Sequence, residues 1–133
     1  MKLLLQPVGS NCCGQACVAM ICGITLEQSI QLLGTKGKTN TAQLIEALRE
    51  HGYTPFWGLT RIARGKILHE GLVIVKFKLK NQNWAHWVVL ETAENLYYDP
   101  ATGVHRGPPQ WLITGGARAV SYLVVRWDKD PRK

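Results

Sequence analysis

Residues 10–22 read Ser-Asn-Cys-Cys-Gly-Gln-Ala-Cys-Val-Ala-Met-Ile-Cys, and this stretch opens the helical half of the chain. Small and apolar residues fill positions 13–22, a pattern typical of a buried helix. A second helix is predicted through Leu33, because Thr25 and Gln28 have the spacing of a capping box. The fold is therefore predicted to begin with helices.

A third helix and then a sheet follow in the sequence. Apolar residues recur at helical spacing from Thr41 to His51, and Gly52 follows as a C-cap. β-Branched and alternating residues then predict strands and one short helical turn, at 72–79 (running from the core to a sheet edge), 84–90 (central in the sheet), 96–99, 108–113 (the turn) and 119–127. Helices followed by a mainly antiparallel sheet predict an α+β fold, with residues 1–133 forming a single domain.

The composition narrows the class of protein. The three consecutive leucines near the N-terminus are too few for a signal peptide, and no run approaches a membrane span, so a cytoplasmic protein is expected. All four cysteines fall between positions 12 and 22, which favours reduced thiols over a disulfide framework. No C-x-x-C pair is present, so a zinc site is a weak alternative, and no motif calls for a cofactor.

The formal net charge of +7 has two readings. It can describe a solvated surface, or it can attract an acidic peptide, a nucleic acid or a membrane surface. No interleaved basic and aromatic motif of a nucleic-acid-binding module is present, so a peptide or protein partner is expected rather than a nucleic acid.

Cys13 is the candidate nucleophile. It stands where a turn gives way to a helix, and the partial positive charge of a helix N-terminus favours the nucleophilic thiolate. Gly14 adds no side chain and would let a substrate backbone come close. Cys12 would lie at or before the helix cap, and consecutive residues at a helix start point about 100° apart, so only one of the two sulfurs can face a base.

His86 and Asp99 are the candidate base and its orienting partner. His86 interrupts the apolar strand WAHWVVL, where it can be either a satisfied core residue or a catalyst. If 84–90 and 96–99 form a hairpin, Asp99 lies opposite or diagonal to His86 and can accept its ring hydrogen bond. Asp99 can alternatively just begin a turn with Pro100. An amide can partly orient the histidine, so Asp99→Asn is expected to lower turnover less than the loss of His86 does.

Gln6 is the candidate oxyanion donor. It precedes Cys13 by seven residues, and a side-chain amide near the nucleophile can stabilise the oxyanion together with the Cys13 backbone N–H.

The order Gln6, Cys13, His86, Asp99 resembles that of papain-like cysteine peptidases. The segments QPVGSNCCGQACVAM, AHWVVL and YYDPATG are most similar to the bacteriocin-processing peptidases that remove double-glycine leaders. The resemblance implies a papain-like fold and roles for these four residues as oxyanion glutamine, nucleophile, base and orienter. The chain differs from the family at Cys12, where an acidic residue is usual, and at Gln15, where proline is frequent. The interval from Gln6 would also suit Cys12 as the nucleophile.

These residues predict a thiol hydrolase that cleaves a peptide or isopeptide bond. The same acyl-enzyme could serve deamidation or acyl transfer. A degenerate peptidase fold that only binds a peptide is the alternative from a different class.

Overall fold

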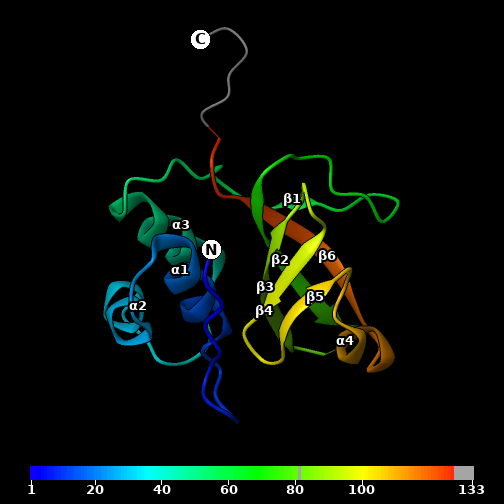
Figure 1. Cartoon of the computed structure of the whole chain (residues 1–133), viewed down its shortest axis with the longest axis horizontal. Coiled ribbons are helices and arrows are strands. Elements are labelled where there is room, and N and C mark those ends of the chain that lie inside the picture. The colour runs from blue at the N-terminus through cyan, green and yellow to red at the C-terminus, as the bar shows by residue number, and fades with distance from the viewer. Residues whose placement is uncertain (81, 128–133) are drawn as a thin grey trace, which may run out of the picture.

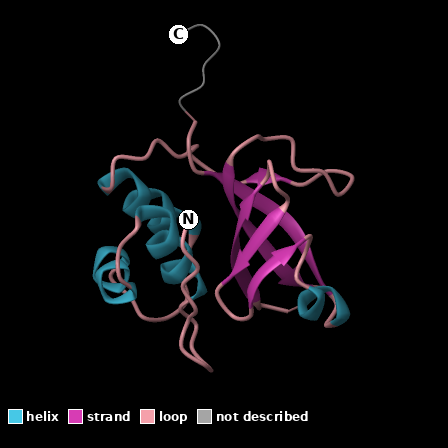
Figure 2. Cartoon of the chain, viewed as in Figure 1, coloured by secondary structure: helices cyan, strands magenta, loops and turns pink. Residues whose placement is uncertain are grey.

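The computed structural model describes residues 1–80 and 82–127. The fold is α+β, as predicted, with a group of helices beside a six-stranded antiparallel sheet (Figure 1). In chain order the elements are α1 (Cys13–Cys22), α2 (Leu26–Leu33), α3 (Thr41–Glu50), β1 (Thr60–Arg61), β2 (Leu72–Leu79), β3 (Ala85–Glu91), β4 (Leu96–Asp99), β5 (Gly103–Arg106), α4 (Gln110–Thr114) and β6 (Ala117–Val124). The first three helices gather on one side of the sheet, and α4 stands apart from them (Figure 2).

The helices begin and end where their capping residues require. The predicted capping box is present, since Thr25 Oγ1 accepts the Gln28 N–H and Gln28 Oε1 accepts the Thr25 N–H. A second capping box, between Asn40 and Gln43, starts α3 at the predicted residue. Helix α3 ends one residue before the prediction, because His51 already occupies the C-cap position.

The strands lie in the order β1-β6-β2-β3-β4-β5. Strand β3 is central, as predicted, but the prediction that β2 runs out to a sheet edge is wrong, since β6 and β3 flank it along its length. The alternation of apolar residues and lysines in the second half of β2 instead reflects one buried and one more accessible face of the sheet. The other predicted bounds shift slightly: β3 starts at Ala85, α4 spans Gln110–Thr114, and β6 spans Ala117–Val124. The two short strands β1 and β5 have no sequence signal of their own.

Two apolar clusters fill the two faces of the sheet. One lies between the sheet and helices α1 to α3, and Trp87 and Val89 of β3 belong to it. The other lies on the opposite face, with Val88 and Leu90 of β3 and with Leu112 of α4. Alternation along β3 therefore divides its side chains between the two clusters.

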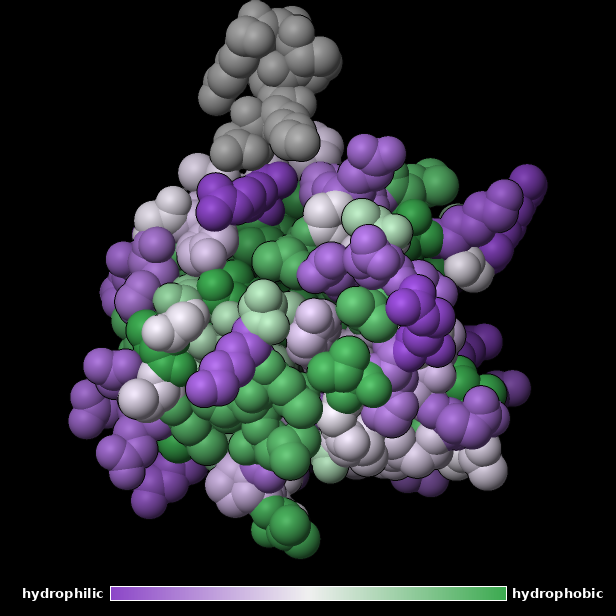
Figure 3. All heavy atoms as spheres, viewed as in Figure 1, coloured by the Kyte–Doolittle hydropathy of each residue, from purple (hydrophilic) through white to green (hydrophobic). Residues whose placement is uncertain are grey.

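The N-terminal segment runs down the front of the molecule between the helices and the sheet (Figure 1). Leu3 and Leu4 pack against the helix-side cluster. Figure 3 shows apolar side chains gathered in the middle of this face and hydrophilic ones around its border. The Gln6 N–H donates to the Pro100 carbonyl at 2.8 Å, which ties the segment to the end of β4. Within the described residues, no single helix is long and apolar enough to cross a membrane.

Candidate active site

The first turn of α1 separates the two neighbouring thiols. Cys12 is the N-cap residue, and its S–H donates to the Lys36 carbonyl at 3.0 Å. Cys13 is the first helical residue, and its side chain lines a cleft of about 430 Å³ together with Gln6 and His86. The structure therefore brings Cys13, and not Cys12, to the predicted base.

Two buried polar side chains hold this turn of α1 in place. Both hydrogens of the Gln15 amide donate to backbone carbonyls of the following loop, at 2.7 Å to Thr35 and 2.8 Å to Gly37. The Ser29 hydroxyl of α2 donates to the Gln15 carbonyl at 2.7 Å. Gln15 and Ser29 are fully buried, so the position of α1 is fixed by contacts that water does not weaken. Sequence reasoning did not anticipate this role of Gln15.

Gly14 has a structural role that differs from the predicted one. A Cβ at this position would overlap Thr39 Oγ1 and would lie 3.2 Å from Thr39 Cβ. The residue is thus required for close packing of the loop before α3 against α1. The expectation that Gly14 leaves space for a substrate backbone is wrong, because Thr39 occupies that space.

His86 and Asp99 meet across the β3–β4 hairpin. The registered pairs run from Glu91↔Leu96 to Val89↔Tyr98, so Asp99 lies diagonal to His86, as the hairpin predicted. His86 Nε2–H donates to Asp99 Oδ1 at 2.7 Å. The ladder stops before His86, and α1 packs against β3, so the start of that helix reaches the imidazole.

Asp99 is fully buried and accepts four hydrogen bonds. Besides His86, its donors are the Ala101 N–H at 2.9 Å, the Thr102 hydroxyl at 2.7 Å and the Trp111 indole N–H at 2.6 Å. Burial raises the pKa of the carboxyl, but these hydrogen bonds outweigh it and bring the pKa from 3.8 down to about 2. Asp99 is therefore a carboxylate held in a fixed orientation.

Trp111 and Thr102 are site residues that sequence reasoning missed. Thr102 follows Asp99 in the same turn, a spacing at which side-chain bonds within an Asp turn are common, so the sequence did hold a signal for it. Trp111 comes from α4, twelve residues beyond Asp99. Its contact depends on how α4 packs on the sheet, and no local pattern reports that.

The His86 ring is enclosed by aromatic side chains. Trp84 stacks on it with ring centroids 5.9 Å apart, and Trp111 meets it edge to face at 5.3 Å. This burial lowers the pKa of His86, but hydrogen bonds with Asp99 and Cys13 outweigh it and bring the pKa from 6.5 up to about 9. The hydrogen bonds with Asp99 and Cys13 therefore favour the protonated form of His86.

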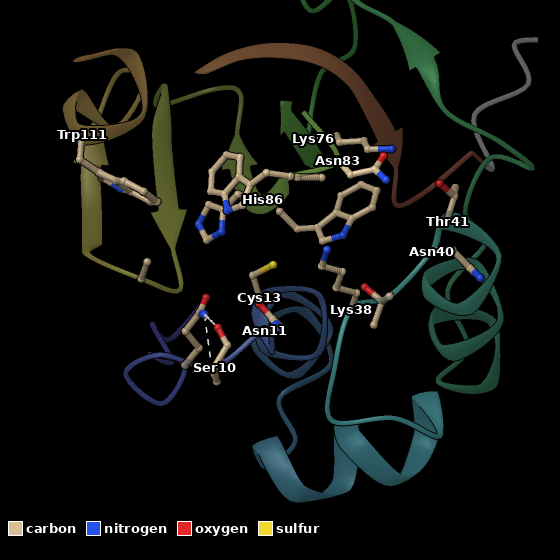
Figure 4. A pocket seen from close by; sticks show the side chains of 16 residues that line it. Ser10, Asn11, Cys13, Lys38, Asn40, Thr41, Lys76, Asn83, His86 and Trp111 are labelled. Atoms are coloured by element: carbon tan, nitrogen blue, oxygen red, sulfur yellow. Dashed lines mark hydrogen bonds between the residues drawn. The ribbon is translucent and has the colours of Figure 1, made fainter. Parts of the chain in front are cut away.

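Figure 4 shows Cys13 below the His86 ring, and both residues line the cleft. Because Nε2 bonds to Asp99, Nδ1 is the ring nitrogen left for the thiol. The structure thus places His86, an acid–base residue, beside the Cys13 thiol, and the bond to Asp99 fixes the orientation of the imidazole. These are the elements that nucleophilic catalysis by cysteine needs.

Gln6 lines the same cleft as Cys13. Its Nε2 donates to the Ser10 carbonyl at 2.9 Å, while its buried Oε1 has no hydrogen-bond partner. The same Nε2 also lies 3.4 Å from the Ser10 hydroxyl, a longer contact that a ligand in the cleft can replace. The structure therefore brings together all four predicted site residues: Gln6, Cys13, His86 and Asp99.

The other cysteines and histidines do not line the cleft. All four cysteines are free, but burial raises the pKa of Cys17 well above its ordinary value and raises that of Cys22 to about 11. Among the histidines, His51 caps α3, and His105 bonds to the Thr102 hydroxyl at 2.7 Å. Within the described ranges, no three His, Cys, Asp or Glu side chains are grouped so that they could hold a metal ion.

No protein-family model matches the chain, and no curated protein is significantly similar to it.

Proposed function

We propose that this protein is a cysteine peptidase, a thiol hydrolase that cleaves peptide or isopeptide bonds. The observation that supports this most strongly is the chain of contacts from Asp99 through His86 to Cys13. The fully buried Asp99 carboxylate bonds to one ring nitrogen of His86, and the other ring nitrogen is left for the Cys13 thiol at the start of α1. Few structural roles need this arrangement, because an inert core histidine does not require a thiol as its second partner.

The reaction follows from the positions of these groups. His86 takes the proton of the Cys13 thiol and the sulfur attacks the carbonyl carbon, and the oxyanion receives hydrogen bonds from the Gln6 amide and the Cys13 backbone N–H. The His86 imidazolium then gives its proton to the leaving amine, which departs and leaves a thioester on Cys13. His86, now neutral, accepts a proton from a water molecule that attacks the thioester and releases the acid. Asp99 stays ionised throughout and stabilises the imidazolium.

The architecture supports a papain-like fold, with the nucleophile on the first helix and the base on the sheet. The resemblance of the QPVGSNCCGQACVAM, AHWVVL and YYDPATG segments to double-glycine leader peptidases favours the same fold. The four free thiols support a reducing compartment such as the cytoplasm.

Labelling with a peptidyl acyloxymethyl ketone tests the proposal. The full-length protein is treated with limiting reagent near neutral pH, and the adduct is mapped by peptide mass spectrometry. We expect fast labelling of Cys13 in the wild type and in Cys12→Ser, and no comparable labelling in Cys13→Ser. Cys12→Ser is a matched control, because the two residues are equally buried, at 5% and 8% exposed, and a serine hydroxyl can keep the bond to Lys36.

Rapid labelling of Cys12 in the Cys13→Ser protein would mean that the wrong thiol was chosen. If Cys13 labels no faster than a free cysteine, the protein is a binding module and not an enzyme. Intact mass of the wild type with ester substrates, in water and with added amines, then separates hydrolysis from acyl transfer.

A further inference from the structure

Four basic side chains share one face of the sheet beyond the cover of the helices. On β2, Lys76 and Lys78 follow Ile74, which lies in the helix-side cluster, and alternation puts them on that same face. Their cross-strand partners extend the set. Lys78 pairs with Arg118 of β6, and Lys76 pairs with Ser121, which in turn pairs with Arg61 of β1.

No acidic side chain of the described residues neutralises these cations, although Lys76 lies over the Trp87 ring, 5.5 Å from its centroid. Lys78 and Arg118 are directly opposed in the ladder, and like charges at opposed positions destabilise a sheet. Among the described residues, the only ion pair between side chains is His86–Asp99, so none of the described carboxylates lies within 4.0 Å of these cations. Repulsion between Lys78 and Arg118 that no described acidic side chain offsets favours an anionic ligand at this place.

The cations continue directly from the catalytic cleft. Figure 4 shows Lys76, Asn83 and Lys38 on the opposite side of Cys13 and His86 from Trp111. These three residues line the cleft. Asn83 also lines a neighbouring hollow of about 660 Å³, whose other polar residues are Lys78, Lys80, Gln82 and Arg118. Asn83 thus lies between the cleft that holds the thiol and the basic hollow.

We propose that this basic hollow, defined by Lys78, Lys80 and Arg118, binds an acidic segment of the polypeptide substrate, to one side of the bond that is cleaved. The inference rests on the proposed peptidase function and specifies its substrate class. A polypeptide fits better than a nucleic acid, because the hollow is lined by Lys78, Leu79, Lys80, Gln82, Asn83, Arg118 and Val120, with no aromatic ring for a base to stack on.

Binding is measured by fluorescence anisotropy with full-length Cys13→Ala, so that the result does not depend on catalysis. The probes are two fluorescein-labelled peptides that differ only in a block of glutamates or glutamines, each prepared with the block at either end. We expect one glutamate peptide to bind about tenfold more tightly than its glutamine counterpart at low salt, equivalent to about 1.4 kcal/mol. This ratio should fall toward one as the ionic strength rises.

Two triple variants carry the same change in charge. Lys78→Gln/Lys80→Gln/Arg118→Gln should abolish the preference for glutamate. The control, Lys2→Gln/Arg49→Gln/Lys66→Gln, removes three exposed cations that line neither the cleft nor the hollow, and should retain the preference. Equal binding of the two peptides, or equal loss in both triple variants, would overturn the proposal. So would tighter, hollow-dependent binding of a single-stranded oligonucleotide.

The outcomes separate this proposal from the peptidase function. If acidic peptides bind through the hollow but Cys13 is not labelled by the peptidyl ketone, the peptidase function fails and the acidic-segment site stands. If Cys13 is labelled and glutamate has no effect, the reverse holds.

Discussion

Asp99→Asn is expected to destabilise the protein, an effect that the sequence alone does not suggest. All four groups around the carboxylate are donors, two on each oxygen. An asparagine oxygen can keep His86 and Ala101, but its NH₂ then faces the Trp111 indole N–H, another donor. One buried donor loses its partner and the bond to charged His86 loses its ionic component, so the free energy of unfolding should fall by about 2–4 kcal/mol.

The activity should fall as well. Without the carboxylate, the pKa of His86 drops below its value of about 9, and the imidazolium is less populated. We expect kcat/KM to fall by about a hundredfold, equivalent to about 2.7 kcal/mol.

A double-mutant cycle isolates the donor–donor conflict. Trp111→Phe alone removes one hydrogen bond from Asp99 and should cost about 1 kcal/mol. In the Asp99→Asn background it also removes the conflict, so it should restore about 1–2 kcal/mol. Trp57→Phe, at a ring that is 76% exposed, is the control and should change neither background. Urea unfolding at neutral pH gives each value. Wild-type stability in Asp99→Asn, or simple additivity with Trp111→Phe, would refute this account of the site.

Three further results are expected. The free energy of unfolding, followed by urea titration against pH, should be highest between about pH 4 and 6.5. Because the pKa of Asp99 is lowered, its contribution to stability is fully present above pH 3.8 and is lost as the pH falls through about 2. Because the pKa of His86 is raised, its contribution to stability is fully present below pH 6.5 and is lost as the pH rises through about 9. A flat profile would contradict this. Gln6→Ala should lower kcat by about 10²–10³-fold with little change in KM, because it removes an oxyanion donor, and steady-state kinetics showing a change in KM alone would make Gln6 a binding residue. Gly14→Ala should lower the free energy of unfolding by about 1–3 kcal/mol, because the added methyl group overlaps Thr39. Thr39→Ala in the same protein should recover most of this loss, and calorimetry that shows no recovery would point to another cause.

The sequence was informative where the determinants are local. The capping box at Thr25 and the hairpin between β3 and β4 needed only short-range patterns, and the hairpin was enough to place Asp99 diagonal to His86. The angular spacing of residues at a helix start likewise indicated that Cys12 and Cys13 cannot both face His86.

The sequence was less informative where contacts join distant segments. Trp111 reaches Asp99 only because α4 packs on the sheet, and Thr39 meets Gly14 across the loop before α3. The place of β2 was misjudged for the same reason: alternation shows that one face is accessible, but it does not show how many strands flank it.

The separation of the site residues along the chain bears on when the thiol becomes reactive. Cys13 and His86 are 73 residues apart, and the Gln6 N–H bonds to Pro100 across 94 residues. Such distant contacts form late in folding, because a long loop must close before they contribute. A growing chain therefore exposes Cys13 on the ribosome long before β3 and β4 have been synthesised. During that interval Cys13 has no base and Gln6 is not yet anchored to Pro100, so the proposed activity would arise only once the sheet has closed around the N-terminal segment.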